Sequence, residues 1–347
     1  MRVTRGRVLR AGALAALALV TLALPLVLDA SQLTVYVLLG LAAIVTTGLS
    51  LLMGYAGQIS LGQAAFYAIG GYTAGVMAVH GFPRLLGLAA SPVLAAAVAV
   101  IVGVPLLRLR GHYLAFATLA FQLIVLSVIG EAAFTGGDIG LRGIPQLGVG
   151  SVEFSGSIGY AYLVWVAVAV VLLVCRNIIR SRPGRGLRAL ATSETAAESA
   201  GVPVGRYRLT VFALSAAFAG LAGGIYAFFL GYLSPGSFPI LLSFEYVIMA
   251  VIGGLGTIWG PLLGAALVTV LVQVLNTLGT QPGMPSYAPT VLSYAVYALL
   301  LVLVMVYLPR GLLPSIRSLV ENRRGRPTPP PRAGETAGEE RVTSPHT

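Results

Sequence analysis

The chain has 347 residues, of which 57% are hydrophobic and 10% are charged, and its net charge is +11. Soluble domains contain about 25% charged residues, so this composition and the mean hydropathy of +0.90 exclude a soluble globular protein. Every basic residue is an arginine. Because the arginines lie between and beside apolar runs, they indicate membrane topology and not nucleic-acid binding. The single cysteine, Cys175, excludes an internal disulfide, and three scattered histidines predict no metal site.

Apolar runs of bilayer-spanning length predict an all-α fold, a polytopic membrane helix bundle with about ten transmembrane helices. The runs are too long and too evenly apolar to be strands of a membrane barrel. The first run is longer than the apolar region of a signal peptide, so we interpret it as a retained span. In chain order the runs cover residues 11–28, 33–53, 64–79, 92–107, 113–129, 158–174, 209–230, 244–258, 261–278 and 291–308.

The distribution of charge predicts the orientation of these spans. The loop over residues 130–157 is the least basic long loop and is placed outside, whereas the arginine-rich segment 176–208 is placed in the cytoplasm. Both termini are then cytoplasmic, and only Arg84 and Arg142 lie outside. Residues 1–10 form a basic N-terminus and residues 11–308 the transmembrane domain. The tail over residues 309–347, rich in Pro, Gly, Arg and Glu, is predicted to be disordered.

Segment 176–208 contains a short pattern that predicts a capped helix between Ser193 and Pro203. Thr195 and Glu198 have the spacing of a capping box. Gly201 can adopt the left-handed conformation that ends a helix, and the proline two residues later prevents the helix from resuming. A small helix between membrane spans suggests a docking element for a cytoplasmic partner; an ordinary solvated loop is the alternative.

Two glycine-rich breaks, 54–63 and 253–261, interrupt the apolar pattern in the two halves of the chain. Irregular backbone at membrane depth is tolerated where it is buried in protein or lines a watered path, and paired breaks indicate a transport pathway. Tight turns at the ends of two helical hairpins are the alternative. Glu245, at the outer start of the span 244–258, is the one carboxylate within a predicted span, either interfacial or on the pathway. The pathway candidates are Gly57, Gln58, Ser60, Gln63, Glu245, Gly253, Gly254, Gly256 and Thr257.

The energy source is constrained by two absences from the sequence. The scarcity of carboxylates within the spans argues against a proton- or sodium-driven carrier and weakens the case for an ion channel. A phosphate-binding loop of the Gly-x4-Gly-Lys-Ser/Thr type requires a lysine, and the chain contains none. A passive facilitator remains, as does a permease that a separate subunit powers.

Several motifs, in order along residues 33–308, resemble those of the M-type permease subunit of bacterial branched-chain amino-acid ABC importers. The early motifs begin with Gly-Leu-Ser-Leu-Leu-Met-Gly-Tyr-Ala-Gly-Gln-Ile-Ser-Leu-Gly-Gln, and the later ones include Val-Ile-Gly-Gly-Leu-Gly-Thr. The resemblance is specific because the motifs are numerous and ordered. They lie at residues 48–66, 109–115, 118–121, 135–145, 184–201, 219–223 and 251–257.

The resemblance implies that segment 176–208 is the cytoplasmic coupling loop of a permease domain. Permeases of this kind carry the ATPase-docking motif Glu-Ala-Ala-x3-Gly. Here threonine occupies the glutamate position, and an acidic residue stands on each side of the Thr-Ala-Ala triplet. The implied docking residues are Ser193, Glu194, Thr195, Ala196, Ala197, Glu198 and Gly201.

The resemblance also implies the partners and the localisation. A second permease subunit, two cytoplasmic ABC ATPases and an extracytoplasmic binding protein would work with this chain in a bacterial inner membrane. ATP would be hydrolysed by the partner subunits, so the chain itself would have no catalytic residue, cofactor or metal. Branched-chain or other hydrophobic amino acids are the expected substrates; urea, short amides or sugars, or a passive channel, are the alternatives.

Overall fold

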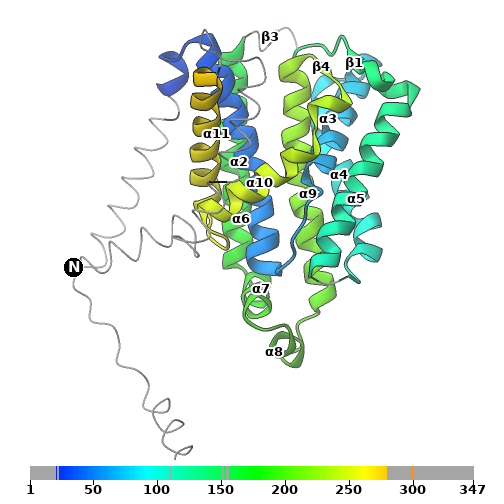
Figure 1. Ribbon diagram of the computed structural model, residues 1–347, viewed down its shortest axis with the longest axis vertical. Coiled ribbons are helices and arrows are strands. Elements are labelled where there is room, and N and C mark those ends of the chain that lie inside the picture. Colours follow the sequence, from blue (N-terminus) through cyan, green and yellow to red (C-terminus); the bar gives the residue numbers. More distant parts are fainter. Residues whose placement is uncertain are drawn as a thin grey trace, which may run out of the picture.

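The computed structural model describes residues 21, 23–109, 111–149, 152–153, 156–279 and 299. Long helices run side by side along the longest axis of the molecule, and two short helices, α7 and α8, project from one end (Figure 1). The bundle consists of α2 (Ala30–Ala56), α3 (Gln63–Val79), α4 (Arg84–Leu106), α5 (His112–Glu131), α6 (Ser157–Arg180), α9 (Val204–Leu230), α10 (Ile240–Gly253) and α11 (Gly260–Gly279).

Among the residues that the structure describes, six stretches are long and apolar enough to cross a bilayer: α2, α4, α5, α6, α9 and the stretch Pro235–Gly253, which ends with α10. These confirm an all-α membrane helix bundle. Eight of the ten predicted spans correspond to helices of the bundle. The predicted span 291–308, the tail 309–347, residues 1–10 and most of the span 11–28 lie outside the described residues. The count of about ten spans and the positions of the termini therefore stay predictions.

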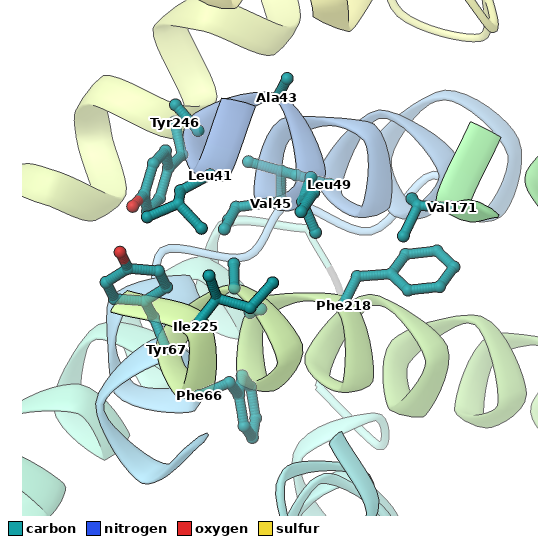
Figure 2. Packing of buried hydrophobic residues seen from close by; sticks show 14 of the residues in the cluster. Leu41, Ala43, Val45, Leu49, Phe66, Tyr67, Val171, Phe218, Ile225 and Tyr246 are labelled. Atoms are coloured by element: carbon teal, nitrogen blue, oxygen red, sulfur yellow. The ribbon is translucent and has the colours of Figure 1, made fainter. Parts of the chain in front are cut away.

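Helix α2 lies at the centre of the bundle. Of its most apolar window 89% is buried, compared with 22% for α4 and 28% for α5, so those two helices form the periphery. Figure 2 shows how Leu41 and Leu49 of α2 face Ile225 and Phe218 of α9 across the core. This largely buried helix is apolar on most sides, as expected for a helix that other helices surround.

Glycines let α3 and α9 cross with their backbones in contact. A β-carbon on Gly70 would collide with the backbone of Gly220, and one on Gly223 would collide with the carbonyl of Tyr67. The glycine pairs Gly71/Gly75, Gly220/Gly224 and Gly260/Gly264, each four residues apart on one helix, are packing surfaces, because added β-carbons would meet neighbouring elements.

Predicted boundaries of α4, α9 and α10 were wrong, and α6 also ends later than predicted, at Arg180 and not at residue 174. Helix α4 begins at Arg84, so Pro92 lies within it and not at its start; the bond that proline removes is tolerated inside a membrane bundle. Helix α9 begins at Val204, directly after Pro203, five residues before the predicted start. Proline suits a position just before a helix because its missing N–H is not needed there. Helix α10 ends at Gly253 and not at residue 258.

The end of the bundle opposite α7 and α8 is covered by short irregular elements. These are η1 (Leu24–Leu26), η2 (Ala133–Thr135), η3 (Gly137–Ile139) and η4 (Pro235–Ser237), with strand β1 (Leu141–Arg142) paired to β4 (Tyr232–Leu233) and β2 (Gly148–Val149) paired to β3 (Val152–Glu153). Hydrogen bonds of the buried Tyr160 connect these irregular elements to the core. Its hydroxyl accepts a hydrogen bond from Leu147 N at 2.8 Å and donates one to Phe228 O at 2.9 Å.

Candidate functional site: a buried polar node between two cavities

The first glycine-rich break separates α2 from α3 inside the bundle. Gly57 ends α2 in the left-handed conformation, with φ +63°, and the chain then runs without helix to Gly62. Gln63, the first residue of α3, reaches Ser215, which lies near the middle of the 27-residue helix α9. Helix α3 therefore begins at about half the depth of the bundle, as the broken helices of many transporters do.

Four buried polar side chains meet where α3 begins, and we call Gln63, Gln122, Ser215 and Ser243 the polar node. Gln63 Nε2 donates to Ser215 Oγ at 3.1 Å. Ser243 Oγ donates to Gln122 Oε1 at 2.7 Å and accepts from the backbone N–H of Ala64 at 3.0 Å. The node thus joins α3, α5, α9 and α10, and it satisfies one of the free N–H groups at the start of α3.

Two amide oxygens beside this start are buried and have no hydrogen-bond partner among the described residues: Gln63 Oε1 and Gln58 Oε1. A buried acceptor without a partner costs about 1–3 kcal/mol, so an apolar residue would be more stable at either position. Ser60 is also buried, 1% exposed, and the nearby Leu61 N donates to Thr118 Oγ1 at 2.9 Å. The predicted candidates Gln58, Ser60 and Gln63 therefore lie in the protein core and not in a solvated hairpin turn.

The predicted candidate Glu245 lies elsewhere, on what we call the outer cavity. This cavity of about 310 Å³ lies between α2, α3, α9, α10 and α11, in the half of the bundle away from α7 and α8. Its polar lining comprises Tyr67, Tyr226, Ser237, Glu245, Tyr246, Thr269 and Gln273. Tyr67 lies one helical turn from Gln63, and Leu242 of the lining is adjacent to Ser243. The outer cavity therefore ends beside the polar node.

A smaller cavity of about 130 Å³, the inner cavity, lies on the other side of the node. Gly57 and Gln58 line it together with Glu194 and Arg208. Arg208 Nη1 and Nη2 donate to the two carboxylate oxygens of Glu194 at 2.8 and 3.0 Å. The side chains are 19% and 29% exposed, so this forked pair is partly shielded from water. It connects the first break to the short helices at the end of the bundle.

These short helices, α7 (Arg182–Thr192) and α8 (Glu194–Ser199), form with the start of α9 what we call the docking elbow. The predicted capping box at Thr195 and Glu198 was wrong, because α8 begins two residues earlier. Ser193 is its N-cap and accepts from Ala196 N at 3.3 Å. Gly201 has φ +78°, which confirms the predicted left-handed helix end.

The docking elbow has its own small core, which divides the predicted docking residues into two groups. Ala197 is fully buried against Leu190 and Val204. Glu194 is paired with Arg208. Ser193 is half-buried at the cap, whereas Thr195, Ala196, Glu198 and Gly201 are exposed. Only the exposed group lies at the surface, whereas Ala197 and Glu194 make contacts within the elbow.

The second break forms a tight turn between α10 and α11. Thr257 Oγ1 donates to Gly254 O at 2.7 Å and accepts from Gly260 N at 3.1 Å. A β-carbon on Gly253 would collide with the carbonyl of Gly260. The turn packs against the end of α2, where Tyr55 Oη donates to Gly256 O at 2.7 Å. Its residues Gly253, Gly254, Gly256 and Thr257 thus mainly contact backbone, and neither the outer nor the inner cavity includes them.

Several residues of the site were missed from the sequence. Gln122, Ser215 and Ser243 each stand as a polar residue inside an otherwise apolar run, which could have marked them as interior. Nothing in the sequence indicated that they would meet Gln63, because the contacts join residues more than 100 positions apart.

The family model for the branched-chain amino acid transport system permease component matches residues 30–305. The high-affinity branched-chain amino acid transport system permease protein LivM of Salmonella typhimurium is 32% identical, over 85% of this chain and 72% of its own length. LivM of Escherichia coli K12 is also 32% identical, over 86% and 72%. The probable LivM of Methanocaldococcus jannaschii is 26% identical, over 66% and 68%. No solved structure matches the chain.

The family match spans most of the chain, and the described helices form an apolar bundle of the kind that a membrane permease needs. The expected resemblance is therefore confirmed. The chain belongs to the permease-component family of branched-chain amino acid transport systems, as a multi-pass subunit of an ABC importer in the bacterial inner membrane.

Proposed function

We propose that this subunit carries branched-chain or other hydrophobic amino acids across the membrane, in a complex with a second permease subunit, two cytoplasmic ATPases and an extracytoplasmic binding protein. The proposal takes its substrate class from the names of the LivM relatives. The observation that supports coupled transport best is the Glu194–Arg208 pair, because it ties the docking elbow to the cavity beside the first break.

The docking elbow is the proposed contact with an ATPase. Thr195, Ala196, Glu198 and Gly201 form its exposed surface. A rigid contact is needed if an ATPase is to move the bundle, and the buried cluster around Ala197 makes the elbow one packed unit with α9. Movement of the elbow would reach α9 directly and the inner cavity through Arg208.

The proposed route runs from the outer cavity, through the polar node, to the inner cavity. Glu245 lines its outer part and Gln58 its inner part. At the polar node, the neutral amides and hydroxyls of Gln63, Ser215 and Ser243 can solvate a zwitterion in passing, whereas a fixed charge at the node would trap it. The first break supplies Gln58 and Gln63 to this route, and Gly253 to Thr257 support it by packing against the end of α2.

The orientation is part of the proposal. Arg108, Arg176 and Arg208 lie at the end of the bundle that carries α7 and α8, together with the arginines of α7, which supports a cytoplasmic position for that end. In a Cys175→Ser background, an impermeant thiol reagent added outside should label Gly137→Cys and spare Ser193→Cys. Labelling of both from outside would contradict the orientation.

Reconstitution tests the function. Proteoliposomes that contain this subunit, its proposed partner permease and both ATPases should take up leucine only with ATP and the binding protein. The purified subunit alone should hydrolyse no ATP. Uptake of leucine without ATP would show a passive facilitator. ATP-dependent uptake of urea, short amides or ribose, but not of leucine, would reassign the substrate.

A further inference from the structure

The outer cavity has two chemically different walls. Helices α2, α10 and α11 each contribute several residues to its lining. On α10, these are Leu242, Glu245, Tyr246 and Met249, which follow the i, i+3, i+4, i+7 spacing of one helix face. Val35, Leu38 and Leu41 on α2 form the apolar wall. A volume of about 310 Å³ falls at the lower end of the range for small-molecule sites.

The polar wall is suited to a cation. The ring of Tyr67 lies 5.3 Å from that of Tyr226 and 6.2 Å from that of Tyr246, measured between centroids. Figure 2 shows Tyr67 and Tyr246 beside Leu41, with their hydroxyl groups turned towards each other. Aromatic faces attract an ammonium group within about 6 Å, and the carboxylate of Glu245 on the same lining adds a full negative charge.

The position of Glu245 within a membrane span costs free energy. A carboxylate within a membrane span is unfavourable, most of all at the bilayer centre, so its default interpretation is functional. On the same lining, Thr269 and Gln273 of α11 offer hydroxyl and amide donors that suit a carboxylate. The cavity therefore presents an acceptor, donors and an aliphatic wall around one space.

We infer that the outer cavity is a transient binding site for a zwitterionic aliphatic amino acid, whose ammonium group is held by Glu245 and the tyrosines and whose side chain lies on the α2 wall. The inference rests on the proposed function and deepens it, because it places part of the selectivity in the permease. The hydroxyl groups of a sugar would face Leu38 and Leu41 and would find no hydrogen-bond partner there, so the site disfavours sugars.

A photoreactive probe tests the site without changing the protein. A leucine analogue that carries a diazirine in its side chain is irradiated during ATP-driven uptake by the complete complex in proteoliposomes. Mass spectrometry should find the label on the segments 35–42 and 242–249, and a large excess of leucine should remove it. Label at these segments that leucine does not displace, or no label there, would overturn the inference.

Two matched variants separate this inference from the proposed function. Glu245→Gln should lower uptake and displaceable labelling about tenfold, the loss expected when a charge-assisted hydrogen bond is weakened. Glu131→Gln, at an exposed carboxylate at the same end of the bundle, should change neither. Normal uptake by Glu245→Gln would overturn the site alone. Absence of ATP-dependent leucine uptake by the unaltered complex would overturn the proposed function and the site together.

Discussion

The two glycine-rich breaks look alike in the sequence and differ in the structure. The first, after Gly57, leads through buried polar side chains to the polar node and has open space beside its left-handed glycine. The second, after Gly253, is a close-packed turn in which backbone meets backbone. Gly57 serves the left-handed conformation in the first break, whereas Gly253 serves close approach of two backbones in the second. A break in an apolar pattern therefore marks irregular backbone, and only its side chains indicate whether it lines a route.

The same substitution at the two glycines should have the largest and most unequal effect. Gly253→Ala places a β-carbon against the carbonyl of Gly260 and should destabilise the subunit by about 3 kcal/mol, so that little complex accumulates. Gly57→Ala meets no neighbouring atom and should cost about 1–2 kcal/mol, from the left-handed backbone alone. The yield of assembled complex and its melting temperature measure both.

Equal loss of complex in the two variants would contradict the distinction between a packed and an open break. Gly256, which has φ +72°, provides a further control within the second break. Gly256→Ala should resemble Gly57→Ala, because its added carbon would lie 3.6 Å from Gly54 O, an ordinary contact.

Much of the fold followed from the apolar pattern, because spans of bilayer length and the distribution of arginine depend on local composition. The predicted start at Pro92 failed because proline inside a membrane helix is tolerated where neighbours satisfy the backbone. The predicted start of α9 failed because proline just before a helix leaves no needed N–H group unpaired. The polar node could not be predicted, since Gln63, Ser215 and Ser243 are brought together only by helix packing. The burial of Ala197 was missed for the same reason.

The connection between the first break and the docking elbow predicts a second effect. Ala197→Asp would bury a charge against Leu190 and Val204, so the elbow should unpack while the bundle remains assembled. ATPase activity of the complex should then lose its response to the binding protein and substrate. Ala196→Asp, the matched change at the exposed neighbour, should retain the elbow and weaken only the contact with the ATPase. If the ATPase activity of both variants responds to binding protein and substrate as that of the unaltered complex does, the elbow has no role in coupling.

A smaller effect is expected at the ion pair. Glu194→Gln removes a partly exposed, forked pair whose contribution to stability is about 1 kcal/mol, so folding should change little. Coupled uptake should fall several-fold, because Arg208 no longer holds the elbow beside Gln58. The exchanged pair, Glu194→Arg with Arg208→Glu, should recover part of the uptake. No recovery, with normal assembly, would indicate that the individual side chains act without the pair.

The smallest effect is expected where the second break contacts α2. Tyr55→Phe removes one hydrogen bond, to Gly256 O, and should cost about 1 kcal/mol with uptake per complex unchanged. A thermal unfolding curve and an uptake assay on the same preparation measure it. Loss of uptake at normal stability would show that the second break takes part in the transport cycle.

The central claim is that the polar node lies on the transport route, and a paired apolar replacement tests it most directly. Gln63→Leu with Ser215→Ala removes both partners of one hydrogen bond, a change that is nearly neutral for stability. Uptake of leucine per assembled complex is the measurement. We predict normal assembly and a loss of uptake of at least about tenfold, since a dry apolar node would no longer solvate a zwitterion. Normal uptake per complex would contradict the claim and return the node to a purely structural role.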